Sequence, residues 1–255
     1  MAAVSSFRYS TGEITTAEKA KSFSWEAPIP VNRFWDSFSY PTARNFLANF
    51  SDHELEQLAV DPMGINPDDT TDQQKKLQLL LQLLRNKLAK EEAAISPPQS
   101  FYEVDYKRWN GIWQGIYTLE NELDLPQAEE TVRMLVEKRL DDSNVIPIHL
   151  LAEHLVKIWK YKEAEETARS VYEWMVSRPH LGKHSPQALN ARRIIAKALW
   201  GQGPSRRSEA EALVAEIHEL VYGMGGSKFA IYQEEEARLN EEMVAGLNLV
   251  IKKSY

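Results

Sequence analysis

The chain has 255 residues, 43% of them hydrophobic, which is enough to bury the core of one large domain or of two small ones. Its formal net charge of −7 argues against a protein that mainly neutralises nucleic-acid phosphates, because such binding relies on clustered Lys and Arg. The lack of cysteine in the sequence excludes disulfides, thiolate nucleophiles and cysteine-based metal sites.

Residues 1–40 are predicted to form an extended arm whose aromatic side chains lie on the rest of the protein, with a partly ordered tail as the alternative. Pro28 and Pro30 oppose a regular helix, and disordered tails usually lack aromatic residues. The segment contains no long apolar run, so we expect neither a signal peptide nor a membrane-spanning helix, and a soluble, cytoplasmic protein. The large apolar residues of the arm are Phe23, Trp25, Ile29, Val31, Phe34, Trp35, Phe38 and Tyr40.

Residues 41–98 are predicted to form N-terminal helices. Thr42 can cap the first, while Ser51-x-x-Glu54 and Thr70-x-x-Gln73 have the capping-box pattern. Leucines at helical spacing follow the second box, and such an apolar stripe must pack against other helices of the chain or against a second chain. We favour packing within the chain, with a homodimer seam as the alternative. The leucines of the stripe are Leu77, Leu80, Leu81, Leu84 and Leu88.

Residues 99–226, after the Ser96-Pro97-Pro98 break, are predicted to form helix pairs that repeat one pattern. The pattern in residues 151–165 returns in residues 195–211, including the Glu-Ala-Glu triplets that begin at Glu163 and Glu209. A weaker copy precedes them, with a helix from about Trp109 to Leu123 and a second helix from residue 127. Repeated helix pairs bury their apolar faces by stacking, which predicts an all-α fold.

Residues 227–255 are predicted to form a capping helix and tail. Ser227 follows a glycine-rich break and can begin this helix. One face of the helix is apolar and the other is rich in glutamate, as expected for a terminal helix that covers the last repeat and faces water.

Leu181-Gly182-Lys183-His184-Ser185-Pro186-Gln187-Ala188-Leu189, together with residues 195–203 and 209–213, resembles the tetratricopeptide repeats of the kinesin-light-chain type, which occur widely in filamentous fungi. The resemblance covers about residues 108–222 and is degenerate over 108–143. Trp159 stands where the turn between paired helices normally has Gly, and Leu125 replaces the usual turn Tyr. The resemblance implies a right-handed superhelical stack of antiparallel helix hairpins, whose first helices line a concave groove that commonly holds peptides.

On this register the groove presents aromatic and basic side chains. Lys157, Arg193 and Lys197, with Asn190 as a neutral donor, could hold a carboxylate or an acidic peptide, because charge-assisted hydrogen bonds are the strong ones. The alternative is that these side chains are simply solvated. The predicted groove residues are Trp113, Tyr117, His149, Lys157, Asn190, Arg193, Lys197 and Trp200.

The histidines offer few candidates for chemistry. His149 lies one helical turn before Glu153, and an imidazole beside a carboxylate can act as a general base, although a partly buried structural histidine is the alternative. His180 and His184 have a chelating spacing only if helical, and the proline and glycine around them predict a loop. We therefore predict no metal and no cofactor.

Two functions fit these patterns. The one we favour is a non-enzymatic adaptor that holds an acidic or carboxylate-bearing peptide of a partner protein in its groove and binds neither nucleic acid nor membrane. The other is a cofactor-free enzyme of small-molecule, including secondary, metabolism. In that case His149, Glu153 and Lys157 would be catalytic, and Trp35 and Phe38 of the arm would close an aromatic pocket.

Overall fold

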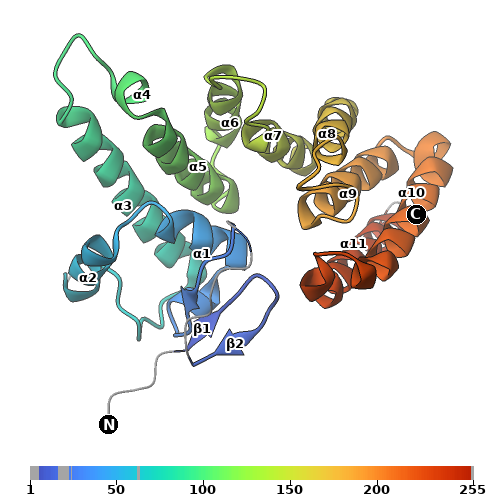
Figure 1. The fold of residues 1–255 in the computed structure, drawn as a ribbon, viewed down its shortest axis with the longest axis horizontal. Coiled ribbons are helices and arrows are strands. Elements are labelled where there is room, and N and C mark those ends of the chain that lie inside the picture. Colours follow the sequence, from blue (N-terminus) through green and yellow to red (C-terminus); the bar gives the residue numbers. More distant parts are fainter. Residues whose placement is uncertain (1–5, 17–22, 24, 62–63, 254–255) are drawn as a thin grey trace. The chain divides into compact units, whose positions relative to one another are not determined.

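The computed structural model describes residues 6–16, 23, 25–61 and 64–253, with side chains as far as residue 247. The chain divides into two compact units, Met1–Leu135 (unit 1) and Val136–Tyr255 (unit 2). The described residues form eleven α-helices and three two-residue strands (Figure 1). The predicted all-α class is therefore confirmed. Each unit is described by itself.

Unit 1 begins with a small antiparallel sheet of strand order β2-β1-β3. β1 (Phe7–Arg8) pairs with β2 (Ile14–Thr15) on one side and with β3 (Ile29–Pro30) on the other. Pro30 is tolerated in this sheet because it lies on an edge strand, where the missing N–H breaks no ladder hydrogen bond. The segment that the sequence predicts to be extended thus includes paired strands. A run of two residues is too short for its hydrophobic pattern to predict a strand.

The aromatic side chains of the arm form part of the core of unit 1. Phe34, Trp35 and Phe38 are 0%, 4% and 3% exposed around the short 3-10 helix η1 (Trp35–Ser37). The ring centroids of Trp35 and Phe46 lie 5.8 Å apart, which ties the arm to the first α-helix. Trp35 and Phe38 are therefore core residues, not the lid that the enzyme hypothesis requires.

Two of the three predicted caps in unit 1 are shifted. The capping box of Ser51 and Glu54 is present as predicted. Ser39, not Thr42, caps the first helix, and Asp72, not Thr70, caps the third. Both neighbours are equally good caps by type, so sequence alone leaves such boundaries uncertain by a few residues. The helices are α1 (Tyr40–Leu47), α2 (Asp52–Val60), α3 (Gln73–Ala93), α4 (Phe101–Val104), α5 (Tyr106–Glu122) and α6 (Ala128–Glu137), which crosses the division between the units.

The leucine stripe of α3 is buried, and α3 packs against α5. Gly115 of α5 permits a close approach, since a Cβ at this position would lie 2.8 Å from Leu84 Cδ1. Packing within the chain, which the sequence favours, thus accounts for the stripe. The five leucines proposed for a homodimer seam are each at most 7% exposed and so are covered within the chain: Leu77, Leu80, Leu81, Leu84 and Leu88.

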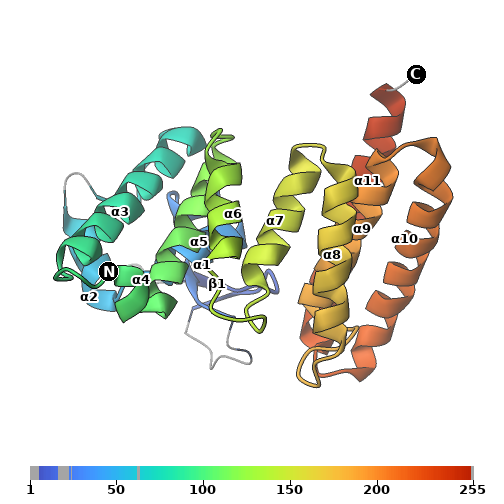
Figure 2. The ribbon, with the colours of Figure 1, turned by 90° about the horizontal axis from the view of Figure 1, so that it is seen from above.

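Unit 2 is built from helices that pack on their neighbours in the chain. Its helices are α7 (Ile146–Lys157), α8 (Tyr161–Val176), α9 (Pro186–Gly201), α10 (Arg207–Tyr222) and α11 (Gln233–Lys253). Each packs against the next, and α9 also contacts α7 and α11. Figure 2 shows α7 to α10 side by side, as expected for antiparallel pairs joined by short turns. Alanines at the contacts, including Ala152, Ala164, Ala196 and Ala210, are wholly buried.

The turn between α7 and α8 closes on a residue in the left-handed region. Trp159 has φ 64°, its N–H donates to Val156 O, and the N–H of Lys160 donates to Leu155 O. This is the Schellman arrangement, in which glycine normally occupies the left-handed position. Trp159 thus adopts a backbone conformation that glycine would adopt without strain. The turn after α9 uses Gly203, with φ 104°.

The last helix begins later than predicted. The Ser227 hydroxyl accepts from the N–H of Phe229 and donates to Met224 O, so it closes a turn between two 3-10 segments. The α-helix starts only at Gln233. Ser227 is thus a turn residue, because its oxygen is engaged two residues ahead, not three.

Candidate functional site

A pocket of about 370 Å³ lies in unit 2 between α9 and α11. The N-terminal end of α8 and the C-terminal half of α7 complete its wall. We call it the α9 pocket. It is lined by Val156, Tyr161, Asn190, Arg193, Lys197, Trp200, Gly201, Leu239, Glu242, Met243, Gly246 and Leu247.

α9 brings four of the eight predicted groove residues to this pocket. The helix is started by Ser185, whose side chain accepts from the N–H of Ala188, and by a proline in its first turn. From there, steps of three and four residues keep side chains on one face of the helix. The four residues on that face are Asn190, Arg193, Lys197 and Trp200.

The wall of the pocket is largely apolar. Val156, Trp200, Leu239 and Met243 contribute apolar surface from three helices. Gly201 gives room for the ring of Tyr161, since a Cβ at Gly201 would lie 2.4 Å from ring atoms. A site of this kind holds an apolar group and orients it by the few polar atoms that reach the cavity.

Arg193 is not the exposed groove cation that the sequence predicts. Its Nη2 lies 2.7 Å from Glu236 Oε2 of α11, and each side chain is 5% exposed. Burial raises the pKa of Glu236, although the charge of Arg193 opposes the shift. Arg193 Nη1 and Trp200 Nε1 are also buried and have no hydrogen-bond partner among the described residues. Arg193 therefore joins α9 to α11 and is already neutralised.

Lys197 lines the same pocket but, unlike Arg193, is not paired with a carboxylate in the part of the chain that the structure describes. Its residue is exposed, and among the described residues Nζ makes neither a hydrogen bond nor an ion pair. The pKa of Lys197 is lowered, chiefly by burial and also by the positive charge of Arg193, while Glu153 and Glu242 oppose the shift. Lys197 is thus a cation at the pocket without a contacting carboxylate.

His149, Glu153 and Asn190 form a polar cluster beside the pocket. Asn190 Nδ2 donates to Glu153 Oε1 at 2.6 Å and lies 2.9 Å from His149 Nε2, which is 3.5 Å from the same Glu153 oxygen. Burial raises the pKa of Glu153, but the interactions with His149 and Asn190 outweigh it, so that the pKa is lowered overall. The ring nitrogen through which His149 meets Glu153 is already engaged by Asn190.

The remaining predicted residues do not line the pocket. Lys157 is exposed at the end of α7. Trp113 and Tyr117 lie on α5 in unit 1, where Tyr117 is 2% exposed and the ring centroids of Trp113 and Trp109 are 6.3 Å apart. Of the predicted groove residues, the four on α9 line the α9 pocket.

Sequence reasoning missed the contribution of α11. It assigns the helix a capping role and treats its glutamates as a solvated face, yet Leu239, Glu242, Met243 and Leu247 line the pocket. One signal was present: Glu236 falls three and seven positions before Leu239 and Met243, on the apolar face of the helix. A charged residue on a buried face needs a buried partner, and the partner here is Arg193.

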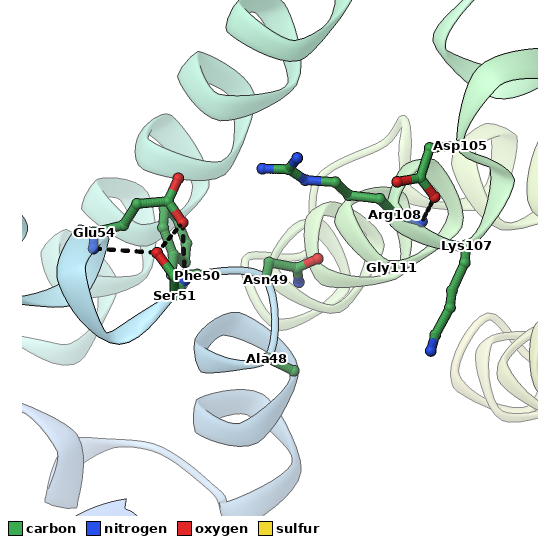
Figure 3. A pocket seen from close by; sticks show the side chains of 9 residues that line it. All are labelled: Ala48, Asn49, Phe50, Ser51, Glu54, Asp105, Lys107, Arg108 and Gly111. Carbon is green, nitrogen blue, oxygen red and sulfur yellow. Dashed lines mark hydrogen bonds between the residues drawn. The ribbon is translucent and has the colours of Figure 1, made fainter.

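A second hollow, of about 710 Å³, lies in unit 1 between the end of α1 and the first turns of α2 and α5 (Figure 3). Its charged groups, apart from the exposed Lys107, are engaged within the protein. Glu54 accepts from Ser51 in the capping box, Asp105 accepts from the backbone N–H of Arg108, and the Arg108 side chain pairs with Glu91. We therefore place the candidate site at the α9 pocket.

Among the described residues, no group of three or more His, Cys, Asp or Glu side chains is arranged to hold a metal ion. No helix in the described ranges is both long and apolar enough to cross a membrane. Comparison with protein-family models, with curated proteins and with solved structures finds no match to the chain.

Proposed function

We propose that unit 2 is a peptide-binding module of tetratricopeptide-like helix pairs, and that the α9 pocket holds a carboxylate-bearing segment of a partner protein. The helix pairs α7/α8 and α9/α10 lie at the positions that the sequence resemblance predicts for paired helices. The turn after each first helix contains a left-handed residue, Trp159 or Gly203. These features support the interpretation of unit 2 as repeated helix pairs. The chemistry of the pocket supports the choice of ligand.

The observation that carries the proposal is Lys197. An ammonium without a contacting carboxylate stands at a largely apolar pocket. The other charged groups that line the pocket are Arg193, paired with Glu236, and Glu242, paired with Arg238. A ligand that gains from both features has an apolar body next to an anionic group. The C-terminal residue of a peptide, such as leucine, presents an apolar side chain and a carboxylate within one residue. We therefore refine the ligand to a peptide that ends in an apolar residue.

The volume of the pocket agrees with this ligand. About 370 Å³ is room for one or two side chains, not for a long stretch of peptide. The rest of the peptide would lie outside the pocket, and the affinity would come mainly from the buried end.

The test compares short fluorescent peptides that end in leucine with a free carboxylate or with an amide, by fluorescence anisotropy. The free carboxylate should bind better, and Lys197→Gln should weaken binding roughly ten- to hundredfold, the usual value of a charged hydrogen bond. Lys162→Gln is the matched control, because Lys162 is exposed on α8 and does not line the pocket. Equal affinity for the acid and the amide, or an unchanged affinity in Lys197→Gln, would reject the proposal.

Arg193 is unsuitable as a first probe. Because it is buried against Glu236, Arg193→Glu would place two carboxylates together and unfold the site. Loss of binding in that variant would say nothing about the ligand.

The enzyme hypothesis gains no support from the same contacts. The ring nitrogen through which His149 meets Glu153 is engaged by Asn190, and Lys157 does not line the pocket. The arm residues Trp35 and Phe38 are in the core of unit 1. We therefore keep the binding module as the proposal.

A further inference from the structure

The surroundings of Lys197 favour a reaction of its amine as well as the binding of an anionic group. Its side chain reaches a pocket walled by Val156, Leu239 and Met243, and its Nζ contacts no carboxylate among the described residues. Arg193, one turn earlier on the same helix, adds a positive charge that its ion pair with Glu236 offsets in part. Lysines become nucleophilic when an apolar pocket or a neighbouring cation favours the neutral amine.

We propose that Lys197 is a carbonyl-reactive amine, and that the α9 pocket takes a small aldehyde or ketone with an apolar body, which joins Nζ as an imine. The pocket supplies the apolar enclosure and the residue remains exposed to solvent, so a small molecule can reach the amine. This inference uses the same pocket as the proposed peptide site, but it does not depend on peptide binding.

The reaction balances without an oxidant or a cofactor. The lone pair of the neutral Nζ forms the new C–N bond, and the carbonyl π electrons move to oxygen. That oxygen then leaves as water with two protons, equal in number to those lost from the amine, and a C=N bond remains. Hydrolysis with one water molecule returns the free lysine and the carbonyl compound.

Charged groups from three helices set the protonation of Lys197. Glu153 of α7 and Glu242 of α11 favour the ammonium, whereas Arg193 of α9 favours the amine. Tyr161 of α8 also faces the pocket. Desolvation at the pocket is the largest cause and the charge of Arg193 adds to it, so that the pKa of Lys197 is lowered. More of the amine is therefore neutral near physiological pH than for a lysine in water.

The test is reductive trapping on the full chain. The protein is treated with benzaldehyde and sodium cyanoborohydride, and the modified lysines are identified by peptide mass spectrometry as a function of time. Lys197 should be modified first and at a lower pH than Lys162, which is exposed on α8 and outside the pocket. Equal rates at Lys197 and Lys162 in the wild-type protein would overturn the inference.

Two variants separate this inference from others. Gly246→Leu fills the pocket from α11, where a Cβ would meet nothing within 4 Å, so the fold should be retained and the preferential labelling of Lys197 should be lost. Unchanged preferential labelling in Gly246→Leu would show that the pocket is not its source. Lys197→Arg keeps the positive charge and removes the reactive amine. It should abolish the main adduct. Peptide binding is measured separately on the wild-type protein by fluorescence anisotropy, so that failure of one proposal is distinct from failure of the other.

Discussion

The buried ion pair between Arg193 and Glu236 offers the sharpest test of how unit 2 is held together. The pair joins α9 to α11 at 2.7 Å, and each side chain is 5% exposed. Arg193→Met removes the charge with little loss of volume and leaves Glu236 in the same buried place. An unpaired buried carboxylate is costly because neither water nor a counter-charge stabilises it.

The expected loss of stability is large. Breaking a buried ion pair by removing one partner typically costs about 3–5 kcal/mol, against a total of about 5–15 kcal/mol for a whole domain. Arg193→Met should therefore detach α11 or unfold unit 2. The double variant Arg193→Met, Glu236→Leu should recover most of the loss, because two well-packed apolar side chains often replace a buried pair at no cost.

The pH dependence has a definite sign. Burial raises the pKa of Glu236 in the folded protein, so the folded state binds the proton more tightly than the unfolded chain does. Such a group contributes stability that is present below its unfolded pKa and is lost as the pH rises through the folded pKa. Arg193→Met removes the opposing positive charge, so its defect should shrink as the pH is lowered from neutrality.

Hydrogen exchange measured on the full chain gives the cleanest assay, because a chain with two compact units need not unfold in one step. The amides of α11 should exchange faster in Arg193→Met, while those of α3 in unit 1 serve as the internal control. Unchanged protection of α11, or an equal defect in the double variant, would refute the role that we assign to the pair.

Three further changes test features outside the pocket. Trp159→Gly should raise the melting temperature of unit 2 by relieving a left-handed strain of about 1 kcal/mol at a residue that is 78% exposed, whereas Trp159→Ala, which keeps a Cβ, should not. Asn240→Leu should stabilise unit 2 in urea unfolding by about 1–3 kcal/mol, because both polar atoms of this wholly buried amide lack a partner among the described residues. An unchanged or lower stability would contradict this expectation. At Glu54, burial raises the pKa but hydrogen bonds from Lys87 and Ser51 outweigh it and hold the pKa at about 2. The stability of unit 1 should therefore fall as the pH drops from 4.5 towards 2, less so in Glu54→Gln, and parallel curves for the two proteins would contradict this linkage.

Local patterns in the sequence predicted local structure well. The capping box at Ser51 and the shared face of Asn190 and Lys197 follow from spacing along one helix. A cap that competes with a good neighbour, as Ser39 does with Thr42, cannot be chosen by type alone.

Contacts between distant segments were the part that the sequence could not supply. Arg193 and Lys197 lie on the same face of α9, so the spacing of the sequence does not distinguish them. Arg193 is buried because it pairs with Glu236 of α11, forty-three residues later. Periodicity shows which face of a helix is shared, but it does not show what covers that face. The strands of the arm were missed for a related reason, since their pairing is decided by partners and not by their two-residue patterns.

The packing of each helix in unit 2 against its neighbours in the chain also has a consequence for synthesis. Contacts between successive helices have a low entropic cost of loop closure, so α7 to α10 can assemble in order during translation. The α9 pocket is different, because part of its wall comes from α11. A nascent chain would therefore have its hairpins in place before it could recognise anything, and ligand recognition would begin only after the final helix had been made.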